Sequence, residues 1–335
     1  MSDIDLSSLK DALNSECATF PQLKSLDLEG ISDIIKAGKV KNVIVMAGAG
    51  ISTAAGIPDF RSPQSGIYDN LDEYNLPFPL AVFSIDYFHI DPSPFFKVAK
   101  RLYRPDAKPT LTHYFFRLLN EKHLLKRLYT QVRRVYCVQL IHQNVDGLER
   151  LAGIDDTVVV EAHGTFNTGH CVKCKKLYDF EYMKNLILDD KIPRCVDKDC
   201  NDVVKPDIVF FGEQLPRKFF TSRGDFDVCD LLIIIGTSLT VTPFSLMVDQ
   251  VRSGVPRLYI NRDVPKIGFN GIPWDDPKNK SDVVFRGDAD VGITRLAELL
   301  GWKDELLELK RKTDEQLDES KPVGADSTSN TGSSK

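Results

Sequence analysis

The stretch Val43–Arg61, VIVMAGAGISTAAGIPDFR, constrains the fold more than any other part of this chain. Its first residues, Val43–Met46, are apolar and mostly β-branched, which is typical of a buried strand in a parallel sheet. Gly48 and Gly50 then allow a tight turn and a close approach of the backbone to a ligand, and the hydroxyl residues that follow stand where a helix could begin. A strand, a glycine turn and a helix N-terminus together predict a socket for a phosphate group.

The glycine spacing departs from the usual dinucleotide fingerprint. The third glycine of G-x-G-x-x-G would fall at Thr53, so a plain dehydrogenase is not favoured. Ala54–Arg61 combines small residues, a rigid Pro58 and a charged end, which predicts a second loop closing over the same pocket. Taken alone, the glycine turn is equally compatible with a tight strand-to-helix turn that binds nothing.

The bulk composition excludes several classes of protein. With 335 residues and a net charge of −5, the chain is long enough for a large core and has no basic stripe that would predict nucleic-acid binding. We find no N-terminal signal peptide and no apolar run long enough for a membrane span, so neither secretion nor membrane insertion is expected. The seven cysteines suit a metal site in a reducing compartment, which predicts a cytoplasmic location with the nucleus as a second option.

Hydrophobic patterns divide the chain into segments. Residues 1–29 form a loosely attached N-terminal segment, for which a surface helix is favoured over an export signal. Residues 62–109 are rich in proline, which predicts short helices and loops forming a separate lobe. Alternation of apolar runs with helical patterns in the rest predicts an α/β fold with a doubly wound parallel sheet. The expected strands beyond the first are Val135–Ile141, Val158–Glu161, Val209–Phe211, Leu231–Ile235 and Leu258–Ile260; the expected helices are 30–41, Tyr114–Leu125, Pro243–Arg252, Ile293–Leu300 and a charged helix from Gly301 to about Leu317, followed by a tail without order.

Four cysteines carry the spacing of a metal site. Cys171 and Cys174 form one pair, and Cys195 and Cys200 form a second pair after a long gap. Two such pairs are the arrangement of a tetrahedral zinc site with four thiolates. Because four sulfurs leave no position for water, the zinc is expected to be structural.

Polar residues follow several predicted strands at the edge where open α/β sheets place their sites. His163 comes directly after Val158–Glu161 and is the best candidate for a general base, since imidazole titrates near neutral pH. Asn144 and Asp146 could hold a ribose or an amide. Gly236-Thr237-Ser238 could hold phosphate or ribose oxygens, and Asn261-Arg262-Asp263 could hold a ribose hydroxyl. Each of these could instead be an ordinary cap or turn, and only their shared location favours a site.

At this point the chain resembles a known family, the sirtuins. Seven elements occur in sirtuin order, namely GAGIS, GIPDFR, QNVD, EAHG, the two cysteine pairs, KPDIVFFGE and GTSL. The similarity covers about Gly30–Trp302 and is strongest to the cytoplasmic sirtuin-two branch. It implies an NAD-dependent protein lysine deacylase whose catalytic domain spans 30–302. Its Rossmann-like part would comprise 30–61, 110–165 and 206–302, and its smaller domain would combine the helical insertion 62–109 with the zinc module 166–205, leaving 303–335 as a charged helix and tail.

The resemblance also implies residue roles. His163 would be the catalytic base, assisted by Asn144 and Asp146. Substrate peptides, acylated on lysine and similar to histone or tubulin tails, would pair with the main chain of Val209, Phe210, Phe211, Gly212 and Glu213, although VFF could also be a plain core strand. NAD would contact Ala47, Gly48, Ala49, Gly50, Ile51, Asp59, Phe60, Arg61, Gln143, Asn144, Val145, Asp146, Gly236, Thr237, Ser238, Asn261, Arg262, Asp263 and Ala289.

One departure from the family pattern concerns the strand before NVD. The family runs from a sequence like LYTQ straight into NVD, whereas here Val132–Gln143 intervenes between Leu128–Gln131 and Asn144. The β-branched content of Val135–His142 favours this segment as the strand, with the excess upstream in a loop. Alternatively, LYTQ remains the strand and the extra residues bulge into the NAD pocket. The insert, which begins with Val and ends with Gln, is also compatible with a short unspliced intron.

Two rival functions remain open at this point. In the first, the insert Val132–Gln143 disrupts the NAD pocket, and the chain is a non-catalytic module that binds acyl-lysine or protein tails. The second rival is transfer of a single ADP-ribose to protein side chains.

Overall fold

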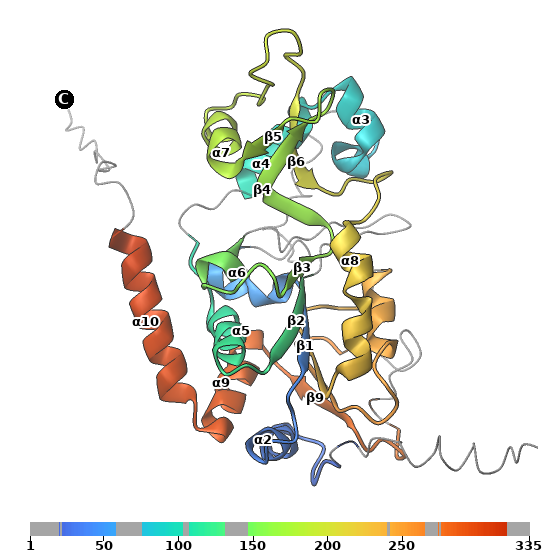
Figure 1. Ribbon diagram of the computed structural model, residues 1–335, viewed down its shortest axis with the longest axis vertical. Helices are drawn as coiled ribbons and strands as arrows, with labels where there is room; N and C mark the ends of the chain where they lie inside the picture. The colour runs from blue at the N-terminus through green and yellow to red at the C-terminus, as the bar shows by residue number, and fades with distance from the viewer. Residues whose placement is uncertain are drawn as a thin grey trace, which may run out of the picture.

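Two β-sheets of different size organise the chain (Figure 1). The computed structural model describes residues 20, 22–57, 76–102, 107–130, 147–239, 242–264, 274 and 276–319. Within these residues, six parallel strands form the larger sheet in the order β3-β2-β1-β7-β8-β9, and three antiparallel strands form the smaller one in the order β5-β4-β6. The larger sheet comprises β1 (Val43–Ala47), β2 (Leu125–Thr130), β3 (Val159–Glu161), β7 (Leu231–Ile235), β8 (Arg257–Asn261) and β9 (Asp282–Arg286). The smaller comprises β4 (Gly164–Cys171), β5 (Leu177–Asp179) and β6 (Val204–Ile208).

The strand order confirms the doubly wound sheet. β1 lies in the middle, pairing with β2 on one side and β7 on the other. The chain moves outward from β1 through β2 to β3 and, after the smaller sheet, resumes on the far side of β1 with β7, β8 and β9. The direction of winding therefore reverses between β1 and β7. In open α/β sheets this switch point is where ligands bind, outside the carboxyl ends of the strands.

Alternate residues of β1 enter different cores, as a strand covered on both faces requires. Val43, Val45 and Ala47 belong to one apolar cluster, whereas Ile44 and Met46 belong to another on the opposite face. The first face is covered by α2 (Leu28–Lys36), α5 (Leu111–Glu121), α9 (Ala289–Leu300) and α10 (Lys303–Glu319), with α6 (Leu148–Leu151) beside α5. The second face is covered by α8 (Arg217–Thr221), η5 (Arg223–Val228) and η6 (Phe244–Asp249), where η marks a 3₁₀ helix.

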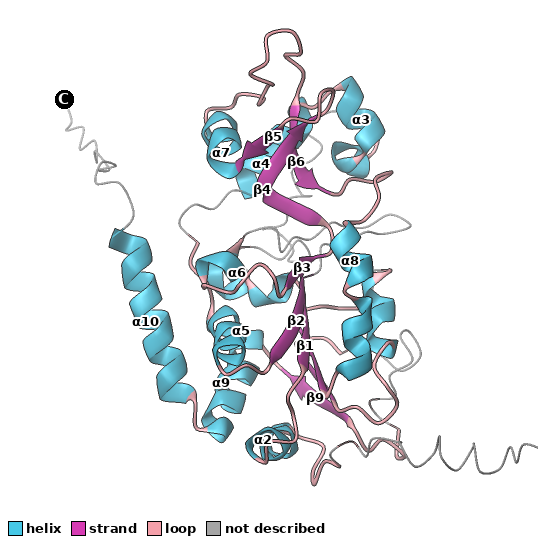
Figure 2. Cartoon of the chain, in the orientation of Figure 1, coloured by secondary structure: helices cyan, strands magenta, loops and turns pink. Residues whose placement is uncertain are grey.

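The smaller sheet has its own core at one end of the molecule (Figure 2). Aromatic rings dominate this core: Phe95 packs edge-to-face on Phe88 and Phe210, with ring centroids 5.6 and 4.8 Å away. The helices around it are η4 (Pro79–Phe83), α3 (Ile85–Ile90), α4 (Ser93–Leu102) and α7 (Phe180–Leu188). The helical segment after residue 62 and the cysteine-rich segment are thus packed together, as the fold class predicted.

The glycine turn differs from its prediction. After β1 the chain forms two short 3₁₀ turns, η1 (Ala49–Ile51) and η2 (Thr53–Ala55), rather than the first turn of an α-helix. Gly56 ends the second turn with a φ of +73°, a left-handed conformation that breaks helical geometry. The α-helix N-terminus predicted at this turn is therefore wrong, because two 3₁₀ turns stand in its place.

The preferred strand after α5 was also wrong. β2 consists of Leu125–Thr130, so LYT occupies the place between β1 and β3 that the prediction gave to Val135–His142. The segment 131–146 lies outside the described residues. The predicted helix Tyr114–Leu125 ends four residues early, because α5 stops at Glu121 and the chain turns at His123 with a φ of +56°.

Two further elements differ in kind. Val209–Phe211 is not a strand of the larger sheet; it continues the smaller sheet's edge after β6, and Phe211 forms an isolated bridge with Ser84. Pro243–Arg252 contains the 3₁₀ helix η6 instead of an α-helix. The strands at 158–161, 231–235 and 258–260 and the helices near 30–41, 293–300 and 301–317 are confirmed, whereas β9 and the three strands of the smaller sheet were missed. Among the described residues, no helix combines the length and apolar character that crossing a membrane requires.

The start of α5 generates a prediction about acid sensitivity. His113 is fully buried, its Nδ1 accepts a hydrogen bond from the Thr110 N–H at 3.2 Å, and burial lowers the pKa of the imidazole to about 3. Between about pH 6.5 and 3 the unfolded chain binds a proton there that the folded chain does not, so the free energy of unfolding falls as pH decreases, by roughly 1.4 kcal/mol per pH unit. Well above pH 6.5 the imidazole is neutral in both the folded and the unfolded chain, so His113 then causes no loss of stability.

His113→Asn keeps an oxygen acceptor for Thr110 and removes the titration. We expect the free energy of unfolding of this variant, measured by urea denaturation at pH 6.5 and 5.5, to decrease by about 1 kcal/mol less than that of the wild type. Equal losses in the two proteins would show that another group controls the acid sensitivity.

Candidate functional site

The carboxyl ends of β1 and β7 interlock at the switch point. Gly48 N donates to Ile235 O at 2.9 Å, and Gly50 N donates to Gly236 O at 2.8 Å. A Cβ on Gly48 would lie 2.6 Å from Gly236 O, and a Cβ on Gly50 would lie 2.8 Å from Gly236 Cα. The two glycines are therefore required by the contact between the turns as much as by any ligand. Ala47–Ile51 and Gly236–Ser238, both predicted to contact NAD, lie side by side.

The end of β8 extends this edge. Tyr259 Oη donates to Thr237 O at 2.7 Å, and Asn261 Nδ2 donates to Asp263 O at 2.7 Å. The Arg262 guanidinium donates to the Asp288 carboxylate, which directly precedes α9. Residues 261–263 and Ala289 thus lie at the same sheet edge as the two glycine turns. The donor set is small residues, backbone amides, hydroxyls and one carboxamide, which fits a nucleotide sugar and its phosphates.

The start of α5 is hydrogen-bonded to the glycine turn that follows β1. Thr110 Oγ1 donates to Ile51 O at 2.9 Å, and Thr112 N and Oγ1 both donate to Asp290 Oδ1 at 2.9 and 2.6 Å. Because Asp290 lies in the first turn of α9, these bonds join the starts of two helices to the end of β1. Thr110 was not among the predicted site residues, although a threonine directly before an apolar helical run is a helix-start signal that could have indicated it.

His163 lies where the two sheets meet. Only 2 % of its surface is exposed, and it stands between β3 and β4. Its carbonyl oxygen accepts a hydrogen bond from Val209 N at 2.8 Å. Gly164 follows with a φ of +84°, and a Cβ there would lie 1.8 Å from Asp207 O, so only glycine allows this crossing of strands. The predicted base and the predicted peptide-binding segment are therefore joined through their backbones.

Strand β3, which directly precedes His163, is anchored by ion pairs of Arg150 that were not predicted from the sequence. Arg150 Nη1 and Nη2 donate to the two Glu161 carboxylate oxygens at 2.8 and 3.1 Å, and Arg150 Nε lies 2.6 Å from Asp156 Oδ1. A bidentate pair of this kind fixes direction as well as distance. It orients the end of β3 two residues before His163.

The four predicted cysteine ligands converge. Their sulfur atoms all lie within 4.8 Å of one another, with Cys171 Sγ 3.4 Å from Cys200 Sγ and Cys174 Sγ 3.6 Å from Cys195 Sγ. Zinc bonded to four sulfurs at about 2.3 Å would hold them about 3.8 Å apart, so the cluster fits this ion. Tyr178 Oη donates to Cys195 Sγ at 3.1 Å and lowers the pKa of that thiol to about 7, which favours the thiolate form that binds metal.

The zinc cluster and His163 lie at opposite ends of β4. Eight residues of extended chain span roughly 20–25 Å. The metal therefore holds the smaller sheet together and takes no direct part in chemistry at His163.

Some predicted site residues lie outside the described residues: Asp59, Phe60, Arg61, Gln143, Asn144, Val145 and Asp146. Their roles stay predictions.

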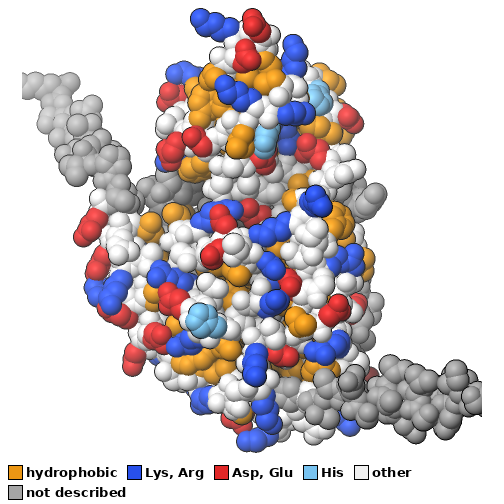
Figure 3. Space-filling model, viewed as in Figure 1, with side chains coloured by type: hydrophobic (Ala, Val, Ile, Leu, Met, Phe, Trp, Pro, Cys, Tyr) orange, Lys and Arg blue, Asp and Glu red, His pale blue; other side chains and the backbone are white. Residues whose placement is uncertain are grey.

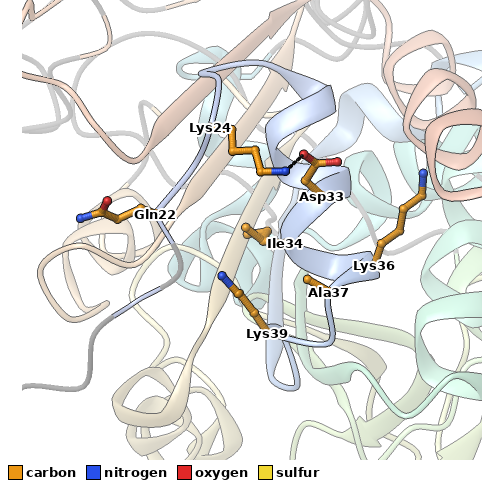
Figure 4. A pocket seen from close by; sticks show the side chains of 7 residues that line it. All are labelled: Gln22, Lys24, Asp33, Ile34, Lys36, Ala37 and Lys39. Carbon is orange, nitrogen blue, oxygen red and sulfur yellow. Dashed lines mark hydrogen bonds and ion pairs between the residues drawn. The ribbon is translucent and has the colours of Figure 1, made fainter.

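A cavity of 420 Å³ lies away from this site (Figure 4). Lys24, Lys36 and Lys39 line it, and Lys24 pairs with Asp33 at 3.1 Å. These residues belong to α2 and the segments around it, which precede β1, so the cavity lies at the opposite edge of the sheet from the glycine turns. It has no part in the candidate site.

The cysteine cluster generates a prediction about metal content. Cys195→Ser removes one thiolate, and we expect the zinc content, measured by inductively coupled plasma mass spectrometry, to fall well below the roughly one ion per chain of the wild type, with a lower melting temperature because metal binding is coupled to folding. Cys229→Ser is the matched control, since Cys229 is buried in the core of the larger sheet and should leave zinc unchanged. Equal zinc contents in the wild type and Cys195→Ser would contradict the assignment.

Comparisons with known proteins agree with this arrangement. Residues 48–243 match the model of the Sir2 family. The chain is 45% identical to the "NAD-dependent protein deacetylase sirtuin-2" of Danio rerio over 94% of its own length and 84% of the relative's. It is 46% identical to the "NAD-dependent protein deacetylase sirtuin-3" of Mus musculus over 88% and 82%, and 44% identical to the "NAD-dependent protein deacetylase hst2" of Schizosaccharomyces pombe over 88% and 82%. The family match and these relatives together lead to one conclusion: this chain belongs to the Sir2 family.

Proposed function

We propose that this chain is an NAD-dependent protein lysine deacetylase that transfers the acyl group to ADP-ribose and releases nicotinamide. The observation that supports the proposal most is the backbone hydrogen bond from Val209 N to His163 O, which joins the segment proposed to bind the peptide to the residue proposed as the base. The family membership and the names of the relatives support the same activity. The chain uses NAD and one structural zinc ion.

The sheet edge divides the task among its residues. When bound, NAD supplies an anomeric carbon from which nicotinamide can leave and the ADP-ribose that accepts the acyl group. The interlocked turns Ala47–Ile51 and Gly236–Ser238 hold the cofactor, with Asn261 near a ribose. Asn144 and Asp146 orient the carboxamide. The imidazole of His163, almost without solvent contact, takes the proton from a ribose hydroxyl, and its burial excludes the water that would compete.

The substrates are proteins acylated on lysine. The segment Val209–Gly212 offers main-chain groups to an extended peptide, and the partly buried ring of Phe211 offers an aromatic wall to the neutral acyl-lysine stem. Unstructured, lysine-rich tails like those of histones or tubulin fit such a segment, and the net charge of −5 favours basic peptides. Thiolate zinc ligands favour a reducing compartment, so we place the protein in the cytoplasm or nucleus.

The test of the activity starts from His163. We expect the wild type to release nicotinamide from NAD only when an acetyl-lysine peptide is present, and His163→Ala to reduce kcat by about 10²–10⁴-fold, the usual contribution of a general base. Chromatography of nicotinamide and mass spectrometry of the peptide measure both products. His89→Ala, which changes an exposed histidine on α3, is the control and should keep full activity. ADP-ribose left on the protein substrate, without loss of the acetyl group, would favour mono-ADP-ribosyl transfer instead.

The insert 132–143 bears on the cofactor because β2 ends at Thr130. Gln131 directly follows the strand, so the extra residues begin at the sheet edge that we assign to NAD, and either Gln131 or Gln143 could take the position of the family glutamine. This observation favours a second candidate, a module that binds acyl-lysine without turnover.

Deleting residues 132–143 joins Gln131 to Asn144 and recreates T-Q-N-V-D. We expect the deletion to lower the KM for NAD by about tenfold or more, which corresponds to about 1.4 kcal/mol of recovered binding. A variant with the same twelve positions replaced by Gly and Ser controls for length. Equal KM values in the full chain and the deletion would show that the insert is tolerated, and a mature transcript that encodes the insert would rule out the intron hypothesis.

A further inference from the structure

Lys205 is a lysine buried inside the smaller sheet. It lies on β6 with 8 % of its surface exposed. Its ammonium donates to Ile208 O at 2.5 Å and Pro206 O at 3.2 Å, and lies 2.9 Å from Glu213 Oε2. Burial lowers the pKa of the ammonium and the Glu213 carboxylate opposes that shift. These polar contacts join the cation to the carbonyls that lead into Val209–Gly212 and to Glu213, which directly follows it.

Glu213 closes the same segment from its other end. Its Oε2 accepts a hydrogen bond from Phe210 N at 2.7 Å, and its own N–H donates to Phe210 O at 3.0 Å. Gly212 within this loop has a φ of +93°, which only glycine adopts at low cost. One carboxylate oxygen therefore serves both the Lys205 ammonium and the backbone of the loop. This carboxylate oxygen faces inward, toward the loop that it closes.

Phe210 covers the ion pair. Lys205 Nζ lies 4.1 Å from the centroid of the Phe210 ring, which is buried and packs edge-to-face on Phe88 and Phe95. The cation is thus enclosed by a ring face, two carbonyls and one carboxylate. The side chain of Phe210 belongs to the core of this lobe, and both of its main-chain groups are engaged with Glu213. Phe210 therefore shapes the loop from inside.

The loop held in this way has two other attachments. Val209 N donates to His163 O at 2.8 Å; Phe211 N donates to Phe83 O at 2.9 Å, and Ile85 N donates to Phe211 O at 3.1 Å. These bonds fix the two sides of the segment at Val209 and Phe211. Between them, the Lys205–Glu213 pair sets the path from Phe210 to Gly212.

A contribution to folding stability does not by itself explain a buried ion pair between Lys205 and Glu213. Taking an ammonium and a carboxylate out of water costs several kcal/mol each, and apolar residues of similar volume often stabilise a core equally well. A buried ion pair does, however, impose a defined geometry on the groups that it contacts. In this lobe those groups are the carbonyls of Pro206 and Ile208, which lead into the segment proposed to receive the substrate, and the N–H of Phe210 within it.

We propose that Lys205 and Glu213 are a positioning pair that sets the backbone of Val209–Gly212 for an extended acyl-lysine peptide. The inference rests on the proposed function. Neither side chain contacts the peptide; both act through the loop. The pair therefore affects the affinity for the peptide. The affinity for NAD depends instead on the sheet edge formed by β1, β7 and β8.

The test measures peptide binding directly. In Lys205→Met, which keeps the stem and removes the ammonium, we expect the Kd for a fluorescent acetyl-lysine peptide, measured by anisotropy, to rise by about tenfold or more, while the KM for NAD stays within about twofold. Glu213→Gln keeps an oxygen for both donors and should weaken binding less than about threefold, whereas Glu213→Ala should weaken it by about tenfold.

Arg257→Met is the matched control. Arg257 and Asp282 form another ion pair of low exposure, with contacts of 2.7 and 2.8 Å, at the start of β8 and β9 and thus at the opposite edge of the larger sheet. We expect this variant to lower the melting temperature without changing the peptide Kd. Peptide affinity that falls equally in Lys205→Met and Arg257→Met would show a merely structural role and overturn the inference, as would an unchanged Kd in folded Lys205→Met.

Other outcomes separate this inference from the activity. If Lys205→Met does not fold, the two Glu213 variants decide, and equal affinities in them overturn the positioning role. A wild type that binds the acetyl peptide but releases no nicotinamide overturns the deacetylase proposal alone, because the pair is tested by binding. A wild type that binds no acyl peptide overturns both.

Discussion

The hydrogen bond from Val209 N to His163 O is the contact on which the rest of the arrangement depends. It lies where a parallel sheet built for a nucleotide meets an antiparallel sheet held by four cysteines. β4 starts one residue after His163, and β6 ends one residue before Val209, so the pairing of these two strands continues into the site. Anything that shifts β4 against β6 therefore shifts the candidate base against the candidate peptide segment. This explains how zinc, far along β4, can matter for chemistry in which it takes no part.

A second constraint acts on the cofactor side. The turns after β1 and β7 approach each other so closely that side chains are excluded at Gly48, Gly50 and Gly236. Hydrogen bonds from Thr110 and Thr112 tie the starts of α5 and α9 to the same edge. α10 then packs along α5 and α9, and Figure 3 shows acidic and basic side chains interspersed along it. Its Asp314 accepts a hydrogen bond from Tyr114 Oη at 2.7 Å. The cofactor edge is thus supported through several layers of packed elements.

Much of this arrangement could be predicted from the sequence, because it follows from local patterns. Buried strands such as Leu231–Ile235 are continuous apolar runs, and the cysteine spacing alone indicates zinc. What could not be predicted depends on distant contacts. Lys205 stands in a strand-like run where a lysine suggests an exposed edge, and only the folded loop brings Glu213 and Phe210 around it. Likewise, Val209–Phe211 has the composition of a core strand, yet its main chain pairs with His163 and Phe83 outside the larger sheet.

The choice of β2 shows how connection length overrides strand propensity. Val135–Ile141 is richer in β-branched residues than Leu125–Thr130, and propensity alone favours it. However, α5 ends at Glu121, and Leu124 N donates to Leu119 O as the chain turns, so Leu125 already lies opposite Val43 of β1. Short connections are the rule between a helix and the following strand of such a sheet. If Val135–Ile141 formed the strand instead, the apolar residues Leu125, Leu128 and Tyr129, which are buried in β2, would have no place in the core. Because the earlier segment takes the strand, the extra residues must leave from its carboxyl end, which is the edge where β1 and β7 form the cofactor turns.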